Sequence, residues 1–147
     1  MGAYTKSSVI QSRKFLSKAK HSEACIRPFA GKEYPDIRIR LVNRDGFKVF
    51  YFATNESVQC IKQYHDCQRY YICFNSTGYI FCKEVGLGGT LEFLRDEESK
   101  KMISLPDVTR SDYYILKLTA HTCSYRSRFA RFPMTNSFFP IEVMDLV

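Results

Sequence analysis

The sequence predicts an all-β domain built from short antiparallel strands. Apolar and aromatic runs, each about four to eight residues long, recur roughly every ten residues over much of the chain. These runs are rich in strand-forming residues and are bounded by Gly, Asn, Asp and Ser. Such a pattern is typical of β-sandwiches, barrels and trefoils, and the pattern alone does not distinguish between the three.

Length and composition agree with one globular domain. The chain has 147 residues, of which 45% are hydrophobic and 15% aromatic, so a packed aromatic core is expected and wholesale disorder is not. The aromatic residues are twelve Phe and ten Tyr, with no Trp. The net charge of +7 favours anionic partners but does not bear on the fold.

Residues 1–35 are predicted to form a basic N-terminal arm that is partly disordered. Basic side chains outnumber acidic ones there, and two prolines and a glycine fall between residues 28 and 35. A short amphipathic helix around residues 9–16 is the alternative. Residues 36–147 are predicted to form the single folded domain.

The first predicted hairpin spans residues 37–53. Residues 37–42 alternate between apolar and polar side chains, and a turn ending at Gly46 leads into a second strand over residues 47–53. A further strand is expected over residues 58–62.

The second predicted hairpin is the central one. Its strands are the aromatic runs 70–74 and 79–82, which flank a four-residue break, Asn75–Gly78. Tyr70, Tyr71 and Tyr79 could form a stacking platform for single-stranded nucleic acid, whereas alternating aromatics in a hairpin more often belong to a core.

Loops and strands are predicted to alternate beyond this hairpin. The Gly-rich segment 84–89 is interpreted as a loop, and it lacks the Lys-Ser/Thr pair of a phosphate-binding loop. Strands are expected over residues 90–94, 112–119 and 138–144. Pro140 near the start of the last strand suits an edge position.

A late basic cluster is the predicted anion-binding site. It consists of Lys117, Arg126, Arg128 and Arg131, with no acidic residue anywhere between the first and the last. Each guanidinium group can fork onto a sulfate or a phosphate. The alternative is an ordinary solvated loop.

Neither a catalytic site nor a metal site is expected. The three histidines are scattered, and His65, Asp66 and Cys67 are adjacent in sequence, where their side chains cannot converge as those of a triad do. The six cysteines include no Cys-x-x-Cys pair, which argues against structural zinc, and their pairing stays open. We therefore expect a protein that is not an enzyme and has no cofactor.

The sequence carries weak signals of location. No secretory signal is visible, and no apolar run is long enough to span a membrane. Asn55 and Asn75 both fit the N-glycosylation pattern and fall in predicted turns, where simple turn chemistry is the alternative reading.

The stretch from residue 49 to residue 93 resembles the middle of the fibroblast growth factor family. In that family a Val-x-Ile-x-Gly-Val strand precedes a hairpin with the pattern Gly-Leu-Tyr-Leu-Cys-Met-Asn-x-x-Gly-x-Leu. The matching segments here are Val58-Gln-Cys-Ile-Lys62, Arg69-Tyr-Tyr-Ile-Cys-Phe-Asn-Ser-Thr-Gly-Tyr-Ile80, Leu91-Glu-Phe93, Asp112-Tyr-Tyr-Ile-Leu116 and Phe138-Phe-Pro-Ile-Glu-Val-Met144. The family's receptor-contact segment is replaced by Asp96–Met102.

This resemblance implies a β-trefoil and a secreted, extracellular signalling ligand. The implied partners are a receptor tyrosine kinase of the fibroblast growth factor receptor type and heparan sulfate as co-ligand, with no membrane insertion. The implied heparin site is the late basic cluster defined above. The alternative, from a different class, is an intracellular β-barrel or trefoil module that binds nucleic acid through the basic arm and exposed tyrosines.

Overall fold

Seven strands, one α-helix and one 3-10 helix form the described part of the chain. A computed structural model describes residues 6–19, 22–28, 37–54, 70–77, 81–94, 114–129 and 135–145. The helices are α1 (Lys6–Lys18) and η1 (Ile141–Asp145). The strands are β1 (Glu23–Pro28), β2 (Ile37–Asp45), β3 (Val49–Thr54), β4 (Tyr70–Thr77), β5 (Phe81–Leu94), β6 (Tyr114–Phe129) and β7 (Thr135–Pro140).

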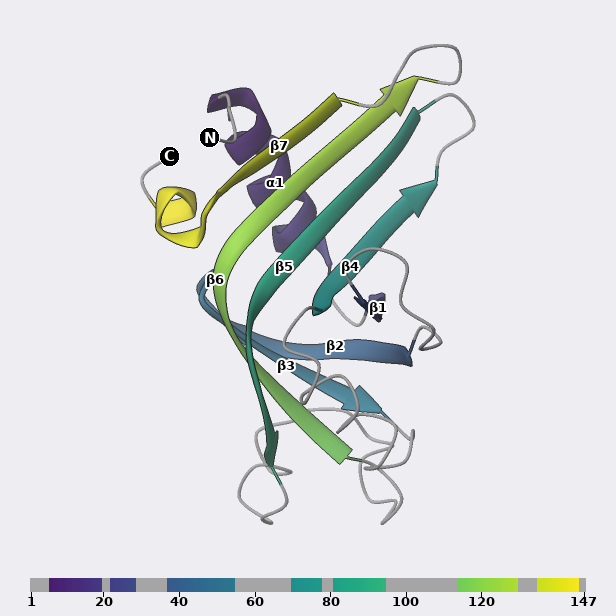
Figure 1. Cartoon of the computed structure of the whole chain (residues 1–147), viewed down its shortest axis with the longest axis vertical. Coiled ribbons are helices and arrows are strands. Elements are labelled where there is room, and N and C mark those ends of the chain that lie inside the picture. The colour runs from purple at the N-terminus through teal and green to yellow at the C-terminus, as the bar shows by residue number, and fades with distance from the viewer. Residues whose placement is uncertain are drawn as a thin grey trace.

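Six of these strands close into a barrel. Their order is β3-β2-β1-β4-β5-β6, and β3 pairs in turn with β6 (Figure 1). Every pairing is antiparallel, and β7 lies outside the closed ring, beside β6. The predicted β-trefoil is therefore wrong. A trefoil consists of six two-stranded hairpins with pseudo-threefold symmetry, whereas here a single sheet closes on itself.

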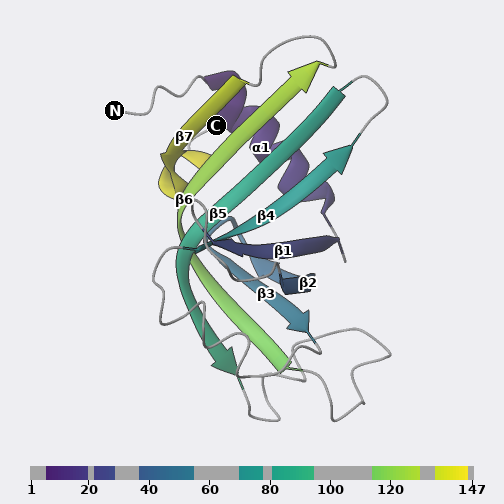
Figure 2. The ribbon, with the colours of Figure 1, turned by 45° about the vertical axis from the view of Figure 1, so that its right-hand side comes forward.

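The long strands β5 and β6 bend sharply and link the two halves of the molecule (Figure 2). A β-bulge between Gly88 and Gly89 interrupts their register. One edge of β6 pairs with β3 over residues 114–119 and with β7 over residues 122–127. The segment 84–89, predicted as a loop, therefore lies in the middle of a strand.

The core consists of the inward-facing side chains of the barrel. Four phenylalanines have at most 1% of their surface exposed, namely Phe50, Phe52, Phe74 and Phe139. The rings of Phe52 and Phe74 lie 6.0 Å apart between centroids, and those of Phe50 and Phe52 lie 6.5 Å apart. The predicted aromatic core is confirmed.

Both predicted hairpins are confirmed, but their details differ. β2 and β3 form the first, and Gly46 has the expected positive φ of 59°. β4 and β5 form the second, but Asn75 lies within β4, opposite Glu84, and not in the turn. The chain end also differs, because β7 stops at Pro140 and η1 follows it. Residues 58–62 and 95–101 lie outside the described residues.

Residues 6–18 form a helix where the sequence favours a flexible arm. α1 lies against one face of the upper half of the sheet (Figures 1 and 2), and Val9 and Leu16 belong to the main core. Ser8 Oγ lies 2.8 Å from Ser137 Oγ of β7. The arm's apolar residues thus complete the core of the barrel. Within the described residues, no helix has the length and apolarity needed to cross a membrane.

One guanidinium group of α1 and one of β2 contact the same ring in the β2–β3 turn. Arg13 of α1 lies 5.6 Å and Arg44 of β2 lies 4.9 Å from the centroid of the Phe47 ring. Cations over an aromatic face are attracted by its negative potential. The same turn that joins the first hairpin therefore also anchors the helix.

Candidate functional site

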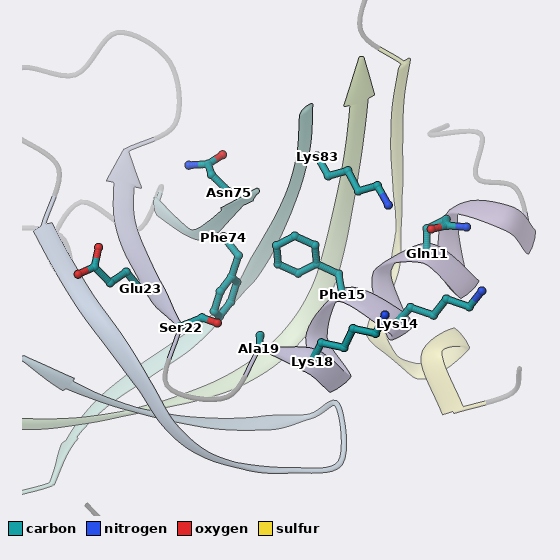
Figure 3. Close-up of a pocket in the computed structure, with 10 residues that line it drawn as sticks. All are labelled: Gln11, Lys14, Phe15, Lys18, Ala19, Ser22, Glu23, Phe74, Asn75 and Lys83. Carbon is teal, nitrogen blue, oxygen red and sulfur yellow. The ribbon is translucent and has the colours of Figure 1, made fainter. Parts of the chain in front are cut away.

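A cavity of about 410 Å³ opens between α1 and the strands β1, β4 and β5 (Figure 3). Sites for small molecules usually have volumes of about 300–1,000 Å³, so this space suits a small ligand. Its lining residues are Gln11, Lys14, Phe15, Lys18, Ala19, Ser22, Glu23, Phe74, Asn75 and Lys83. We call it the α1 cavity.

One face of α1 supplies the helical wall. Gln11, Lys14, Phe15 and Lys18 are spaced at three, four and seven residues, which brings them to neighbouring positions on a helix. The adjacent face of the helix carries the core residues. Lys14 and Lys18 are exposed, whereas Phe15 is half-buried and packs against the core. The helix thus presents two cations, Lys14 and Lys18, next to an aromatic ring.

The opposite wall forms where β1 and β4 separate. Their register runs from Pro28 and Tyr70 to Cys25 and Cys73, and beyond that point the two described strands are not paired. Phe74 points inward and is 1% exposed, whereas Asn75 is exposed. Beyond the paired residues, Glu23 of β1 and Phe74 and Asn75 of β4 line the cavity.

Lys83 brings a cation to the inner face of the barrel. Side chains alternate across a strand, so Lys83 shares a face of β5 with Val85 and Leu87, both of which are fully buried. Lys83 itself is half-buried. The apolar lining of the barrel therefore changes to a positive charge where it meets the α1 cavity.

An aromatic pair forms the middle of the α1 cavity. The rings of Phe15 and Phe74 lie 6.4 Å apart between centroids and meet edge to face at 67°. In Figure 3 the side chains of Lys14, Lys18 and Lys83 lie on one side of this pair, and those of Glu23 and Asn75 lie on the other. The cavity therefore has a positive end, an aromatic middle and a polar end with one carboxylate.

Two members of the predicted late basic cluster have described side chains, Lys117 and Arg126, and the structure places these two far apart. Lys117 and Arg126 are nine positions apart along β6, which corresponds to roughly 30 Å of extended strand. Glu92 is the register partner of Lys117, and Glu84 is that of Arg126. Side chains of opposite charge attract one another when they lie directly across from each other on neighbouring strands. Residues 117–131 contain no acidic side chain, but in the folded protein Lys117 and Arg126 of β6 lie opposite acidic residues of β5.

The other predicted residues give less information. Arg128 lies in β6, opposite Cys82, but its side chain is outside the described part, as are Arg131 and Asn55. Asn75 is exposed in β4 and accepts a hydrogen bond from the Cys73 thiol at 3.6 Å.

Of the three tyrosines in the predicted stacking platform, only the Tyr71 side chain is described. It is half-buried on the outer face of the barrel, where a Cβ built on Gly86 would come within 3.2 Å of its ring. Burial raises the pKa of the Tyr71 phenol, electrostatic interactions with Cys73 and Glu84 raise it further, and Arg27 opposes them. This ring therefore packs on the sheet at a glycine.

Metal ligands do not gather in the described residues. No group of three or more His, Cys, Asp or Glu side chains is close enough there to hold an ion. Cys25, Cys73, Cys82 and Cys123, the cysteines that the described residues include, are all free thiols.

Sequence reasoning missed the residues of the α1 cavity. The signal for the helical wall is present in the sequence as the spacing of Gln11, Lys14, Phe15 and Lys18. Nothing local indicates that Lys83 and Phe74 face that helix, because the contact depends on how the barrel closes. The site therefore emerges only from the tertiary structure.

Comparison with known proteins identifies the fold. No protein-family model matches the sequence, and no curated protein matches it significantly. Among solved structures, one from Clostridium acetobutylicum matches with a TM-score of 0.69 at 21% identity, covering 96% of this chain and 99% of that one. It is described as related to general stress protein 26 of B. subtilis, in the pyridoxinephosphate oxidase family.

Two further structures have the same fold at lower identity. A heme-binding protein from Mycobacterium smegmatis matches with a TM-score of 0.61 at 11% identity, covering 98% of this chain and 62% of that one. A proposed pyridoxamine 5'-phosphate oxidase from Corynebacterium glutamicum matches with a TM-score of 0.53 at 9% identity, covering 86% of this chain and 96% of that one.

These matches overturn the resemblance to fibroblast growth factors. The growth-factor function, the receptor tyrosine kinase and heparan sulfate partners, and the nucleic-acid-binding alternative are not supported by any of them. The resemblance depended on the order and spacing of five short segments between residues 58 and 144, each of which is weakly specific. The chain has the closed six-stranded antiparallel barrel of the pyridoxinephosphate oxidase-like structures.

Proposed function

We propose that this protein binds a small phosphorylated aromatic molecule in the α1 cavity. The observation that carries the proposal is the arrangement of three lysines beside the Phe15–Phe74 pair. A ligand with an anionic group at one end and an aromatic ring at the other matches this arrangement, in which positive charges lie next to an apolar surface.

The phosphate would lie among Lys14, Lys18 and Lys83. Ammonium groups bind phosphate oxygens through charge-assisted hydrogen bonds, which are stronger than neutral ones. The three cations come from α1 and β5 and lie on the same side of the aromatic pair (Figure 3). A single phosphate could therefore contact both walls of the cavity at once.

The ring of the ligand would pack against Phe15 and Phe74. Aromatic rings prefer edge-to-face or offset contacts, and Phe15 already offers its ring to the cavity in this way. Polar substituents of the ring would then reach Asn75 and Glu23 at the far end. The polar end thus provides a basis for discriminating between ring types.

The names of the structural neighbours agree with this ligand class. Pyridoxine phosphate and pyridoxamine 5'-phosphate, which appear in two of those names, are small aromatic rings that carry one phosphate. We propose binding and assign no reaction.

Calorimetric titration with pyridoxine 5'-phosphate, and with unphosphorylated pyridoxine, tests this proposal. Pyridoxine 5'-phosphate has no aldehyde, so it cannot react covalently with surface lysines. We expect saturable 1:1 binding that is lost without the phosphate. Lys83→Gln should raise Kd about tenfold or more, because a hydrogen bond to a charged group is worth about 1.5–3 kcal/mol.

Charge-matched variants separate this site from general attraction. The double variant Lys14→Gln/Lys18→Gln removes two cavity charges, and Lys6→Gln/Lys48→Gln removes two exposed charges that do not line the cavity. The first should abolish binding and the second should leave Kd nearly unchanged. Flavin mononucleotide and haem extend the panel to larger rings. Equal effects of the two double variants, or no binding by any compound, would refute the proposal.

A further inference from the structure

Two free cysteines lie directly opposite each other on neighbouring strands. Cys25 of β1 is the register partner of Cys73 of β4. Opposite residues of an antiparallel pair have Cα atoms about 4.5–5.5 Å apart, within the range of about 4.4–6.8 Å seen in disulfides. We propose that Cys25 and Cys73 form an oxidation site that closes to a cross-strand disulfide by exchange with a small disulfide such as oxidised glutathione.

Both thiols are on the outer face of the barrel. Their sequence neighbours, Ala24 and Ile26 on β1 and Ile72 and Phe74 on β4, fill the core, so the alternating residues point outward. Cys25 is half-buried, whereas Cys73 is only 1% exposed. An oxidant can therefore reach Cys25 first. Cys73 then has to react only with Cys25, which lies opposite it.

The geometry favours a link that can be reduced again. Opposite Cβ atoms in a sheet are about 4.5–5.5 Å apart, whereas those of a disulfide are about 3.5–4.5 Å apart. The two strands must therefore approach each other for the bond to form. Strained disulfides have higher reduction potentials and are the labile ones.

Charges around Cys73 set the rate at which the bond closes. Burial, followed by the hydrogen bond and negative charge of Glu84 on β5, raises the pKa of the Cys73 thiol to about 12, with a smaller contribution from Cys25 on β1. Arg27 of β1 opposes them, and its Nη1 lies 3.6 Å from Cys73 Sγ. Tyr71 on β4 lies in the same cluster.

The exchange has two balanced steps. The Cys25 thiolate attacks one sulfur of the oxidised glutathione, forming a mixed disulfide and releasing one glutathione thiolate. The Cys73 thiolate then attacks the Cys25 sulfur, forming the protein disulfide and releasing a second glutathione thiolate. Each cysteine gives up one proton to solvent, and the two electrons reduce one molecule of oxidised glutathione to two of the thiol. Because the raised pKa keeps Cys73 protonated, the second step should accelerate as the pH rises from 7 to 9.

Peptide mapping of the native chain tests the proposal. The background is Cys82→Ser, because the tryptic peptide 70–83 contains both Cys73 and Cys82. After incubation with oxidised glutathione and alkylation, we expect a linked pair of the peptides 21–32 and 70–83, which a mild dithiol reductant separates. Cys25→Ser and Cys73→Ala should each abolish this pair, with circular dichroism confirming that both variants fold.

Two opposing variants test whether the local charges act as described. Arg27→Gln should slow closure about threefold and Glu84→Gln should speed it about threefold, since a tenfold change in thiolate is partly offset by altered nucleophilicity. Changes in the same direction would contradict this role of the charges. If Cys25 and Cys73 stay unlinked, or link to the same extent in urea as in the native protein, the folded structure does not promote this disulfide and the proposal fails.

Discussion

Single residues of α1 divide between two adjacent faces of the helix. Val9, Ser12 and Leu16 are buried, while the face beginning at Gln11 lines the α1 cavity. Two buried residues of the helix are polar, namely Ser8, whose Oγ lies 2.8 Å from Ser137 Oγ, and Ser12. The Ser12 hydroxyl has no hydrogen-bond partner at bonding distance in the described residues. Burial raises the pKa of the Cys123 thiol to about 12, Ser12 lies close enough to oppose this rise, and the thiol itself donates to the Ser124 carbonyl at 3.9 Å.

Ser12→Ala should stabilise the protein by about 1 kcal/mol. The change removes an unsatisfied buried hydroxyl, and alanine also has a higher helix propensity than serine. Urea denaturation measures the free energy of unfolding. Ser17→Ala is the matched control, because Ser17 is exposed on the same helix and reports propensity alone. A gain for Ser12→Ala no larger than that for Ser17→Ala would show that the buried hydroxyl costs nothing.

At the level of elements, the β-bulge between β5 and β6, whose extra residue is His121 of β6, determines how the sheet is shared between the two halves of the molecule. It lies between Gly88 and Gly89, where the β5–β6 pair bends from the half that contains β7 to the half that contains β3. A Cβ on Gly89 would collide with the backbone of Thr119 and Ala120, whereas one on Gly88 would meet only the Thr122 hydroxyl, at 2.6 Å. The two glycines therefore differ in how a side chain could be accommodated.

Gly89→Ala should destabilise the protein by about 3 kcal/mol, and Gly88→Ala should cost about 1 kcal/mol or less. The Thr122 side chain can rotate away from a new methyl group, but the backbone opposite Gly89 cannot move without breaking ladder hydrogen bonds. Thermal and urea denaturation of both variants provide the comparison. Equal losses would mean that the bulge tolerates a side chain and that the bend has another cause.

The elements that the sequence predicts well are those determined by neighbouring residues. Alternation over residues 37–42 and the positive φ at Gly46 specify the first hairpin locally. The glycines of segment 84–89 predict a loop, but close packing against β6 and a flexible turn both favour residues without a side chain. Sequence alone does not separate these two causes.

At the scale of the whole molecule, closure of the barrel could not be predicted. It depends on pairing between residues 49–54 and residues 114–119, which are far apart in the chain. The order of strands around the sheet is likewise not the order in sequence, since β1 lies between β2 and β4. A resemblance built on consecutive hairpins carries no information on either contact. The α1 cavity depends on both, so the binding site was missed together with the fold.

The first helix should unfold with the barrel as one cooperative unit. Leu16 is 1% exposed and belongs to the same core cluster as residues of all seven described strands, so Leu16→Ala should lower the free energy of unfolding by about 2–5 kcal/mol. Far-UV circular dichroism follows the helix, and near-UV tyrosine signals follow the barrel, where Tyr125 is 6% exposed.

In the Leu16→Ala variant, the unfolding transitions measured by the two signals should both move to lower urea concentration and should coincide, because coincident transitions are the mark of two-state unfolding. A basic arm attached to an independent barrel would behave differently. In that case the helical signal would disappear first in the Leu16→Ala variant while the tyrosine transition kept its parent midpoint. That result would make residues 6–18 a separate element and would also undermine the α1 cavity as a preformed site, since one of its walls would be absent from much of the population.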